Sequence, residues 1–132
     1  MPEAKPDLFV SFAFSVELRT KGIRRPIIEE FAKVQGISLG IDDPSSNLIH
    51  HQHRLLLIRP WIKKSPFRRW MLGRTVPASL LVNVLDRQDK VTQTFFFENV
   101  KGLNWYLSDF DSSKSDLLSE HFELGYDSLE VR

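Results

Sequence analysis

A two-residue alternation over Leu8–Leu18 constrains the fold more than any other feature of the sequence. Every second side chain in this segment is large and apolar, and most residues between them are smaller or polar. Successive side chains of a strand point to opposite faces, so a period of two places the large set on one face. The pattern predicts a half-buried β-strand. The large apolar set is Leu8, Val10, Phe12, Phe14, Val16 and Leu18.

Five further segments have strand character, and two of them form a hairpin. The hairpin strands flank the polar turn Asp86–Lys90. Leu55–Ile58 is apolar at every position, which indicates a strand covered on both faces. We interpret Asn99–Asp116 as a long linking segment before the last strand. The five strand segments are Ile37–Ile41, His51–Arg59, Ser79–Leu85, Val91–Glu98 and Leu117–Tyr126.

One short helix is predicted after Ser65. Ser65 can cap the helix, Pro66 suits its first position, and Gly73 is a plausible stop. The spacing of three and four places three apolar side chains on one helix face. These are Phe67, Trp70 and Met71.

A second segment, Pro26–Val34, is ambiguous. Ile27, Phe31 and Val34 have helical spacing, and Pro26 could begin a helix. Nine residues are short for a stable helix, and Gly36 then opens a strand-like stretch. We interpret Pro26–Val34 as a short helix.

The 132 residues suffice for one domain with a real core. We expect a flexible N-terminal arm over residues 1–7 and a single domain over residues 8–132. About six strands and one short helix predict a mainly β fold of the α+β kind, an antiparallel β-barrel or sandwich with a helix at one side or end. No apolar run approaches the roughly 20 residues of a membrane helix, and the first residues lack a signal-peptide pattern. We therefore expect a soluble, unprocessed chain.

The sequence carries no motif for catalysis. Without cysteine it has no thiolate nucleophile, disulfide or cysteine-based zinc site. No nucleophile elbow, phosphate-binding loop or zinc-protease motif is present. Paired carboxylates occur in polar or amphipathic contexts, where solvation is the ordinary outcome. We expect a non-enzymatic protein with no cofactor. The carboxylate pairs are Asp42 with Asp43, Glu29 with Glu30, and Asp109 with Asp111.

His50, His51 and His53 form the densest group of potential metal ligands. On a strand, His51 and His53 share a face, but a zinc site needs three or four ligands and His121 lies far along the chain. The alternative is a set of polar residues where a strand leaves the core. We expect no metal.

Opposite charges are segregated along the chain. A basic segment without acids and a later acidic segment with a single lysine suit docking between copies, because complementary patches steer one copy onto the next. The alternative is that the two segments are solvated or neutralise each other within one monomer. The candidate interface residues are basic Arg54, Arg59, Lys63, Lys64, Arg68, Arg69 and Arg74, and acidic Asp109, Asp111, Asp116, Glu120, Glu123 and Asp127. Glu130 completes the acidic segment.

The basic segment also interleaves Trp61, Phe67 and Trp70. Aromatic rings could stack on bases while Lys and Arg hold phosphates, so a small nucleic-acid-binding β-domain is an alternative function. The helical spacing of Phe67 and Trp70 favours core packing instead.

The order of these pieces resembles the tail tube (inner tube) proteins of contractile phage tails and extracellular contractile injection systems. The resemblance covers nearly the whole chain from about Leu8, and it rests on the order and spacing of short strings rather than on any single one. In that family the segment matching F-x-x-V-x-G-[LI] is not a regular helix. The matching strings are Phe12–Leu18, Phe31–Ile37, Leu55–Trp61 with Phe67–Trp70, Leu80–Leu85, Phe95–Val100, Asp109–Leu117 and Ser119–Tyr126.

The resemblance implies a structural, self-assembling subunit. Tube proteins form hexameric rings whose strands join into one β-barrel around a lumen, and the rings stack inside a contractile sheath. It implies homo-oligomers, sheath and baseplate partners, cargo or DNA in the lumen, no membrane insertion by this chain alone, and assembly in the bacterial cytoplasm into a phage tail or phage-tail-like particle. Residues Leu80–Glu98 and the last strand would contribute to ring formation or the lumen wall.

The sequence departs from the family between the second and third strands. Tube subunits usually carry a long glycine-rich insertion there that helps to stack rings, whereas only Asp42–Asn47 fills the place. The chain would then be a minimal tube protein or a specialised hub, baseplate or terminal adaptor ring.

Overall fold

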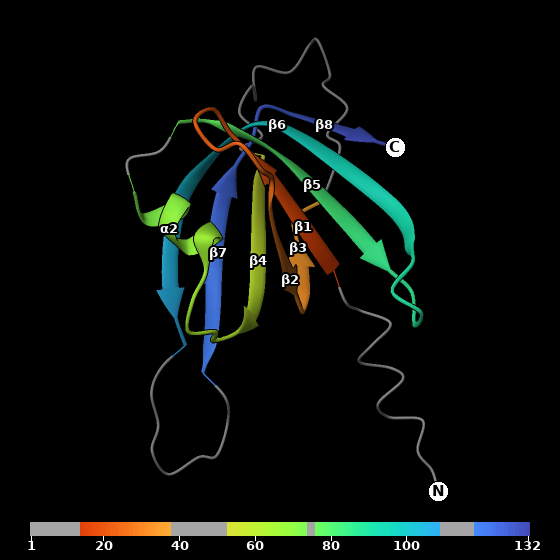
Figure 1. Cartoon of the computed structure of the whole chain (residues 1–132), viewed down its shortest axis with the longest axis horizontal. Coiled ribbons are helices and arrows are strands. Elements are labelled where there is room, and N and C mark those ends of the chain that lie inside the picture. Colours follow the sequence, from red (N-terminus) through yellow and green to blue (C-terminus); the bar gives the residue numbers. More distant parts are fainter. Residues whose placement is uncertain (1–13, 38–52, 74–75, 109–117) are drawn as a thin grey trace, which may run out of the picture.

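The computed structural model describes residues 14–37, 53–73, 76–108 and 118–132 (Figure 1). Within these ranges the chain is mostly β, with one short helix, α2, over Pro66–Leu72. The strands are β1 (Phe14–Arg19), β2 (Ile27–Phe31), β3 (Lys33–Gln35), β4 (Arg54–Pro60), β5 (Ala78–Leu85), β6 (Val91–Leu107), β7 (Ser119–Gly125) and β8 (Ser128–Val131).

The strands pair in the order β2-β1-β5-β6-β7-β4-β3, with β8 added beside β6, and every pair is antiparallel. The long strand β6 belongs to two sheets, because its first half pairs with β5 and β8 and its second half pairs with β7. The first sheet consists of β2, β1, β5, β8 and the first half of β6. The second sheet consists of the second half of β6 with β7, β4 and β3.

Two bends connect the sheets into a barrel. At one side β6 arches over the molecule (Figure 1). Within β6, Asn99 has a φ of 54°, in the left-handed region that Asn tolerates. A register shift between Gly102 and Asn104 accompanies the bend. At the other side only Ala32 separates β2 from β3, and its N–H donates to the Ile58 carbonyl of β4 at 3.0 Å.

The predicted mainly β fold with one helix is confirmed. The predicted hairpin is present as the antiparallel pair β5–β6. The first strand also has its expected buried face, because Val16 and Leu18 of β1 are buried. The helix is capped as predicted: the Ser65 hydroxyl accepts a hydrogen bond from the Arg68 N–H at 2.9 Å, and Pro66 begins the helix. The apolar helix face is buried, as expected for Phe67, Trp70 and Met71.

The prediction of a short helix over Pro26–Val34 is wrong, because the segment forms β2 and most of β3. Ile27 and Phe31 are four residues apart, a spacing that fits one face of a helix and also one face of a strand. The structure buries both against the core and exposes Ile28 between them, as the strand period requires.

The interpretation of Asn99–Asp116 as a linking segment is also wrong up to Leu107. The strand β6 continues through this stretch, and its bend hides the two-residue pattern because the apolar side chains change phase where the strand changes sheets.

The last strand was expected to end near Tyr126. It ends at Gly125, and β8 follows as a separate strand.

The core lies between the sheets, and α2 covers its open side. Rings of Phe31, Phe67 and Phe122 contact one another edge to face, with centroids 5.2 to 5.5 Å apart, and Trp70 lies 5.7 Å from Phe67. The helix thereby supplies core residues that neither sheet provides.

Several predictions fall outside the described residues: the arm over residues 1–7, the first part of the Leu8–Leu18 strand, most of Ile37–Ile41 and the loop Asp42–Asn47. Among the residues that are described, no helix is long and apolar enough to cross a bilayer.

Candidate assembly surfaces

The pairing of β4 with β7 brings the basic and acidic segments together inside one chain. The two strands run antiparallel, with Arg59 opposite Glu120 and Leu56 opposite Glu123. Arg54 reaches across to Glu123, with 2.8 Å between Nη1 and Oε1. The opposite charges of Arg54 and Glu123, and of Arg59 and Glu120, therefore meet within the monomer.

Arg59 and Glu120 are the centre of a buried charge cluster. Arg59 is 2% exposed and Glu120 is fully buried, and Arg59 Nε donates to Glu120 Oε1 at 3.2 Å. Arg68 of α2 donates to the same carboxylate through Nε and Nη2, and Trp105 Nε1 donates to its Oε2 at 2.8 Å. Four strong donor contacts therefore compensate a carboxylate that has lost its water.

Glu29 connects β2 to the same cluster and to the start of α2. Its Oε1 accepts from Arg59 Nη1 at 2.5 Å and from the Ser65 hydroxyl at 2.7 Å, while its Oε2 accepts from the Phe67 N–H at 2.9 Å. A carboxylate at this end of a helix is favourable because it satisfies free N–H groups. We define the charge cluster as Glu29, Arg59, Ser65, Arg68 and Glu120.

Two opposing effects set the pKa of Glu120. Burial raises it, whereas the hydrogen bonds from Arg68 and Trp105 and the positive charges of Arg59 and Arg68 lower it. The lowering effects are larger in sum, so the pKa of Glu120 lies below its ordinary value. The side chain remains ionised, and the cluster acts as a joint between β2, β4, β7 and α2.

Sequence reasoning placed Glu29 in an ordinary solvated carboxylate pair with Glu30, and so missed its role. Only Glu30 has the expected exposure. A strand pattern over Ile27–Phe31 would have pointed to the difference, because it places Glu29 on the same face as Ile27 and Phe31.

The remaining candidate interface residues are dispersed. Lys63, Lys64 and Arg69 are exposed around α2. Asp127 is also exposed and accepts a hydrogen bond from Asn99. Arg74, Asp109, Asp111 and Asp116 lie outside the described residues.

The described histidines are not grouped. His53 stacks on Tyr126 and His121 stacks on Tyr106, in separate places. Among the described residues no three His, Asp or Glu side chains are arranged to hold a metal, and His50 and His51 lie outside them.

The aromatic residues of the basic segment are mostly committed to the core. Phe67 is fully buried and Trp70 nearly so, so neither can stack on a base. Trp61 is partly exposed, but the Arg68 guanidinium lies 3.9 Å from its ring centroid.

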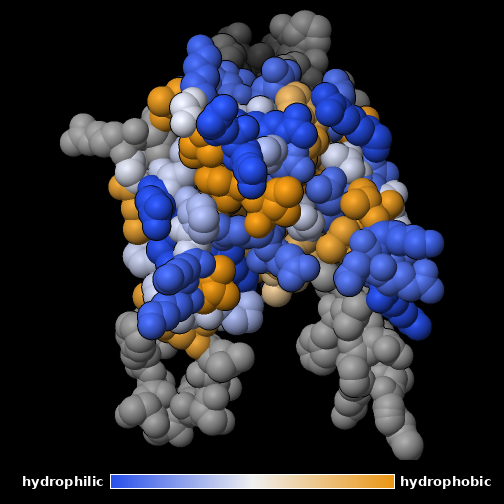
Figure 2. Space-filling model, viewed as in Figure 1, coloured by the Kyte–Doolittle hydropathy of each residue, from blue (hydrophilic) through white to orange (hydrophobic). Residues whose placement is uncertain are grey.

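The outer face of the first sheet is largely polar. Strand register aligns Glu30, Ser15, Asn83 and Thr94 in one row across four strands. The next row combines three apolar residues with two carboxylates. It comprises Ile28, Glu17, Leu81, Phe96 and Glu130. The viewed surface of the molecule likewise mixes hydrophilic and hydrophobic patches (Figure 2).

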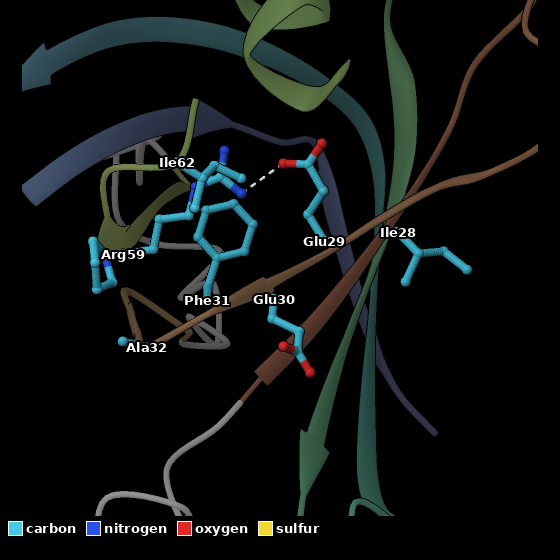
Figure 3. A pocket seen from close by; sticks show the side chains of 8 residues that line it. Ile28, Glu29, Glu30, Phe31, Ala32, Arg59 and Ile62 are labelled. Carbon is cyan, nitrogen blue, oxygen red and sulfur yellow. Dashed lines mark hydrogen bonds and ion pairs between the residues drawn. The ribbon is translucent and has the colours of Figure 1, made fainter. Parts of the chain in front are cut away.

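A groove of about 590 Å³ runs beside β2 (Figure 3). One wall is β2 itself, from Ile28 to Ala32, and the other is formed by Arg59, Pro60 and Ile62. The Glu29 carboxylate points toward Arg59, whereas Ile28 and Glu30 point away from it (Figure 3). The groove follows the side of β2 that does not pair with β1.

The two-sheet barrel with one flanking helix is the tail-tube fold. A chain of the anti-feeding prophage baseplate aligns with 18% identity over 90% of this chain and 91% of its own, with a TM-score of 0.71. A chain of the PVC sheath-tube complex, an extracellular contractile injection system in its extended state, aligns with 14% identity over 92% and 88% and a TM-score of 0.70.

A chain of the sheath/tube terminator of the PVC system aligns with 15% identity over 90% of this chain and 92% of its own, with a TM-score of 0.69. No protein-family model and no curated protein matches the sequence. The resemblance inferred from short sequence strings is therefore confirmed at the level of the fold.

Proposed function

We propose that this chain is a structural, non-enzymatic subunit of the tube, or of a tube-associated ring, in a contractile injection particle. Copies form a closed ring around a lumen, as the hexameric rings of the tube family do. The fold likeness carries the proposal, because it spans at least 90% of the chain and reaches chains of a baseplate, a sheath-tube complex and a tube terminator.

The first sheet is our candidate for the lumen wall. Its outer face carries Ser, Thr, Asn and Glu side chains in register, which suits contact with water and passing cargo or DNA. Its inner face is the core of the subunit. This assignment includes the predicted hairpin Leu80–Glu98 and strand β8.

Ring closure would also solve a problem that the single chain leaves open. The first sheet ends at β2 on one side and β8 on the other, and each pairs with only one strand of the described chain. Edge strands with unpaired backbone groups invite further pairing, and a closed ring removes them.

The chain could instead form a single terminal or baseplate ring. Two of the fold matches come from a baseplate and a terminator, and the insertion that helps rings to stack in the family is nearly absent. We carry this as the second candidate function.

Negative-stain electron microscopy and light scattering of the purified protein test both candidates. Stacked hollow rings or tubes support the tube subunit, and single closed rings support the terminal or baseplate role. A monomer that persists at high concentration overturns both. Salt-dependent retention of that monomer on single-stranded DNA would favour the nucleic-acid-binding alternative.

A further inference from the structure

The outer faces of the two sheets carry opposite net charge. On the first sheet, each of two exposed arginines pairs with the carboxylate two residues before it. Arg19 Nη2 lies 2.5 Å from Glu17 Oε2. Arg132 Nε lies 2.6 Å from Glu130 Oε1. Two further acids of this face stay unpaired, so four carboxylates against two guanidinium groups leave it with a formal charge of −2. The unpaired acids are Glu30 and Glu98.

The carboxylates of Glu30 and Glu98 are exposed and have no ion-pair partner among the described residues. Glu30 is in register with Ser15 on the outer face and points away from Arg59 (Figure 3). Glu98 lies opposite Ser128 of β8, whose hydroxyl donates a long hydrogen bond of 3.5 Å to Glu98 Oε1. Both carboxylates can therefore meet a cation from outside the subunit.

The second sheet has the opposite balance on its outer face. Lys33, Arg54 and Lys101 occupy outward-facing positions and are exposed. Glu123 is the one acid on this face of the described strands, and Arg54 pairs with it. Three bases against one acid leave a formal charge of +2. The acidic balance is therefore a property of one face of the barrel, since the whole chain has a net charge of +1.

Apolar side chains lie between the carboxylates of the first sheet. Ile28 is 60% exposed, and Leu81 and Phe96 are half-buried in the same row. A face that mixes acidic and apolar groups is complementary to a polypeptide with basic and apolar side chains. A nucleic acid, in contrast, finds no unpaired cation for its phosphates on the described part of this face.

We propose that the outer face of the first sheet binds a basic, partly apolar polypeptide segment of a cargo protein. This inference rests on the proposed ring, in which the face lines the lumen. Every copy adds the same two free carboxylates to the wall. A channel lined by charge of one sign focuses the electric field and concentrates groups of the opposite sign. A cationic segment is therefore retained in the lumen, whereas a polyanion is not held.

Co-sedimentation with the assembled protein tests this partner class. The three fluorescent probes are a peptide of Lys, Leu and Ala, its counterpart with Glu in place of every Lys, and a single-stranded DNA oligonucleotide. We expect the Lys peptide to sediment with the rings at low salt and to be released as salt rises, because salt screens exposed charges. The Glu peptide and the DNA should stay in the supernatant.

A double variant relates the binding to this face. Glu30→Gln with Glu98→Gln removes both free carboxylates, and the Kd of the Lys peptide should rise about tenfold or more. The matched control is Asp89→Asn with Glu123→Gln, which removes two negative charges from the β5–β6 turn and the second sheet. Asp89 has a φ of 61°, which Asn tolerates. The control should change the Kd by less than about twofold.

Three results overturn the inference: equal weakening in the two double variants, retention of the DNA by wild-type rings, or binding of the Lys peptide that does not respond to salt. If the first double variant does not assemble, the salt series and the DNA probe on wild-type rings still decide the question.

Electron microscopy of the same samples separates this inference from the proposed function. Rings that leave the Lys peptide in the supernatant overturn the cargo class and leave the ring standing. Rings that hold the Lys peptide and release it with salt support both. A protein that forms no rings overturns both.

Discussion

Two groups of basic residues lie close together in the sequence, but one is buried in ion pairs and the other is exposed to solvent. Arg59 and Arg68 point into the charge cluster and pair with Glu120, whereas Lys63, Lys64 and Arg69 between and beside them stay exposed. Arg can bridge several acceptors with a planar group, and here both arginines contact the carboxylate while also lying over aromatic rings. The basic segment therefore contains two arginines that stabilise the subunit from within and three cations that remain exposed on its surface.

The largest effect should follow from removing the acid at the centre of the cluster. Glu120→Gln leaves Arg59 and Arg68 buried or nearly so without a negative partner. Breaking a buried ion pair on one side costs about 3–5 kcal/mol, because a charge remains uncompensated. The free energy of unfolding, measured by urea denaturation, should fall by that amount.

Glu123→Gln is the matched control, three residues away on the same strand. Its pair with Arg54 is largely exposed on the arginine side, and such pairs contribute less than about 1 kcal/mol. Equal losses in the two variants would contradict the distinction between a buried joint and a surface pair.

A smaller loss is expected at Glu29. Glu29→Gln weakens its bonds to Arg59, Ser65 and the Phe67 N–H, and hydrogen bonds to charged groups contribute about 1.5–3 kcal/mol. Amide exchange at the start of α2 should accelerate as well. Glu30→Gln removes the same charge from the next residue, which is exposed, and should leave both measurements unchanged.

The pH dependence of stability reports on the same joint. The pKa of Glu120 lies below its ordinary value of 4.5, so below that pH the unfolded chain takes up a proton before the folded one does. The contribution of Glu120 is thus present above the ordinary pKa and is lost as pH falls through the lower, folded pKa. Denaturation from pH 7 to pH 3 should show a steeper loss for the wild type than for Glu120→Gln. Parallel curves would contradict this role.

Features of the fold that depend on neighbouring residues could be predicted from the sequence, whereas features that depend on distant strands could not. Local signals were sufficient for α2, whose cap, first proline and apolar face lie within nine residues, and for the hairpin, whose turn is short and polar. The bend of β6 at Asn99 and the corner at Ala32 were not predicted, because each depends on which distant strand lies alongside. The charge cluster depends on the same long-range pairing. It assembles residues from β2, β4, β7 and α2, and no spacing in the sequence indicates that Glu29 and Glu120 share an arginine.

The smallest effect on folding, and the most informative one on assembly, concerns the exposed basic residues. The triple variant Lys63→Glu, Lys64→Glu and Arg69→Glu changes no ion pair within the described chain, so the unfolding midpoint should stay near that of the wild type. Arg68 is left unchanged because its reversal would also break the charge cluster. If these three cations dock an acidic surface of another subunit, the protein concentration needed for assembly should rise about tenfold or more, measured by sedimentation or light scattering.

A second triple variant controls for net charge. Lys21→Glu, Arg24→Glu and Arg25→Glu make the same change in total charge at the exposed turn between β1 and β2. A docking role predicts that only the first variant weakens assembly, and that rising salt reduces the difference between it and the wild type, because screening acts on exposed charges. Equal weakening by both variants would mean that repulsion between whole subunits is responsible. No weakening by either would assign the exposed cations to solvation, and the basic segment would then act only through Arg54, Arg59 and Arg68 inside the subunit.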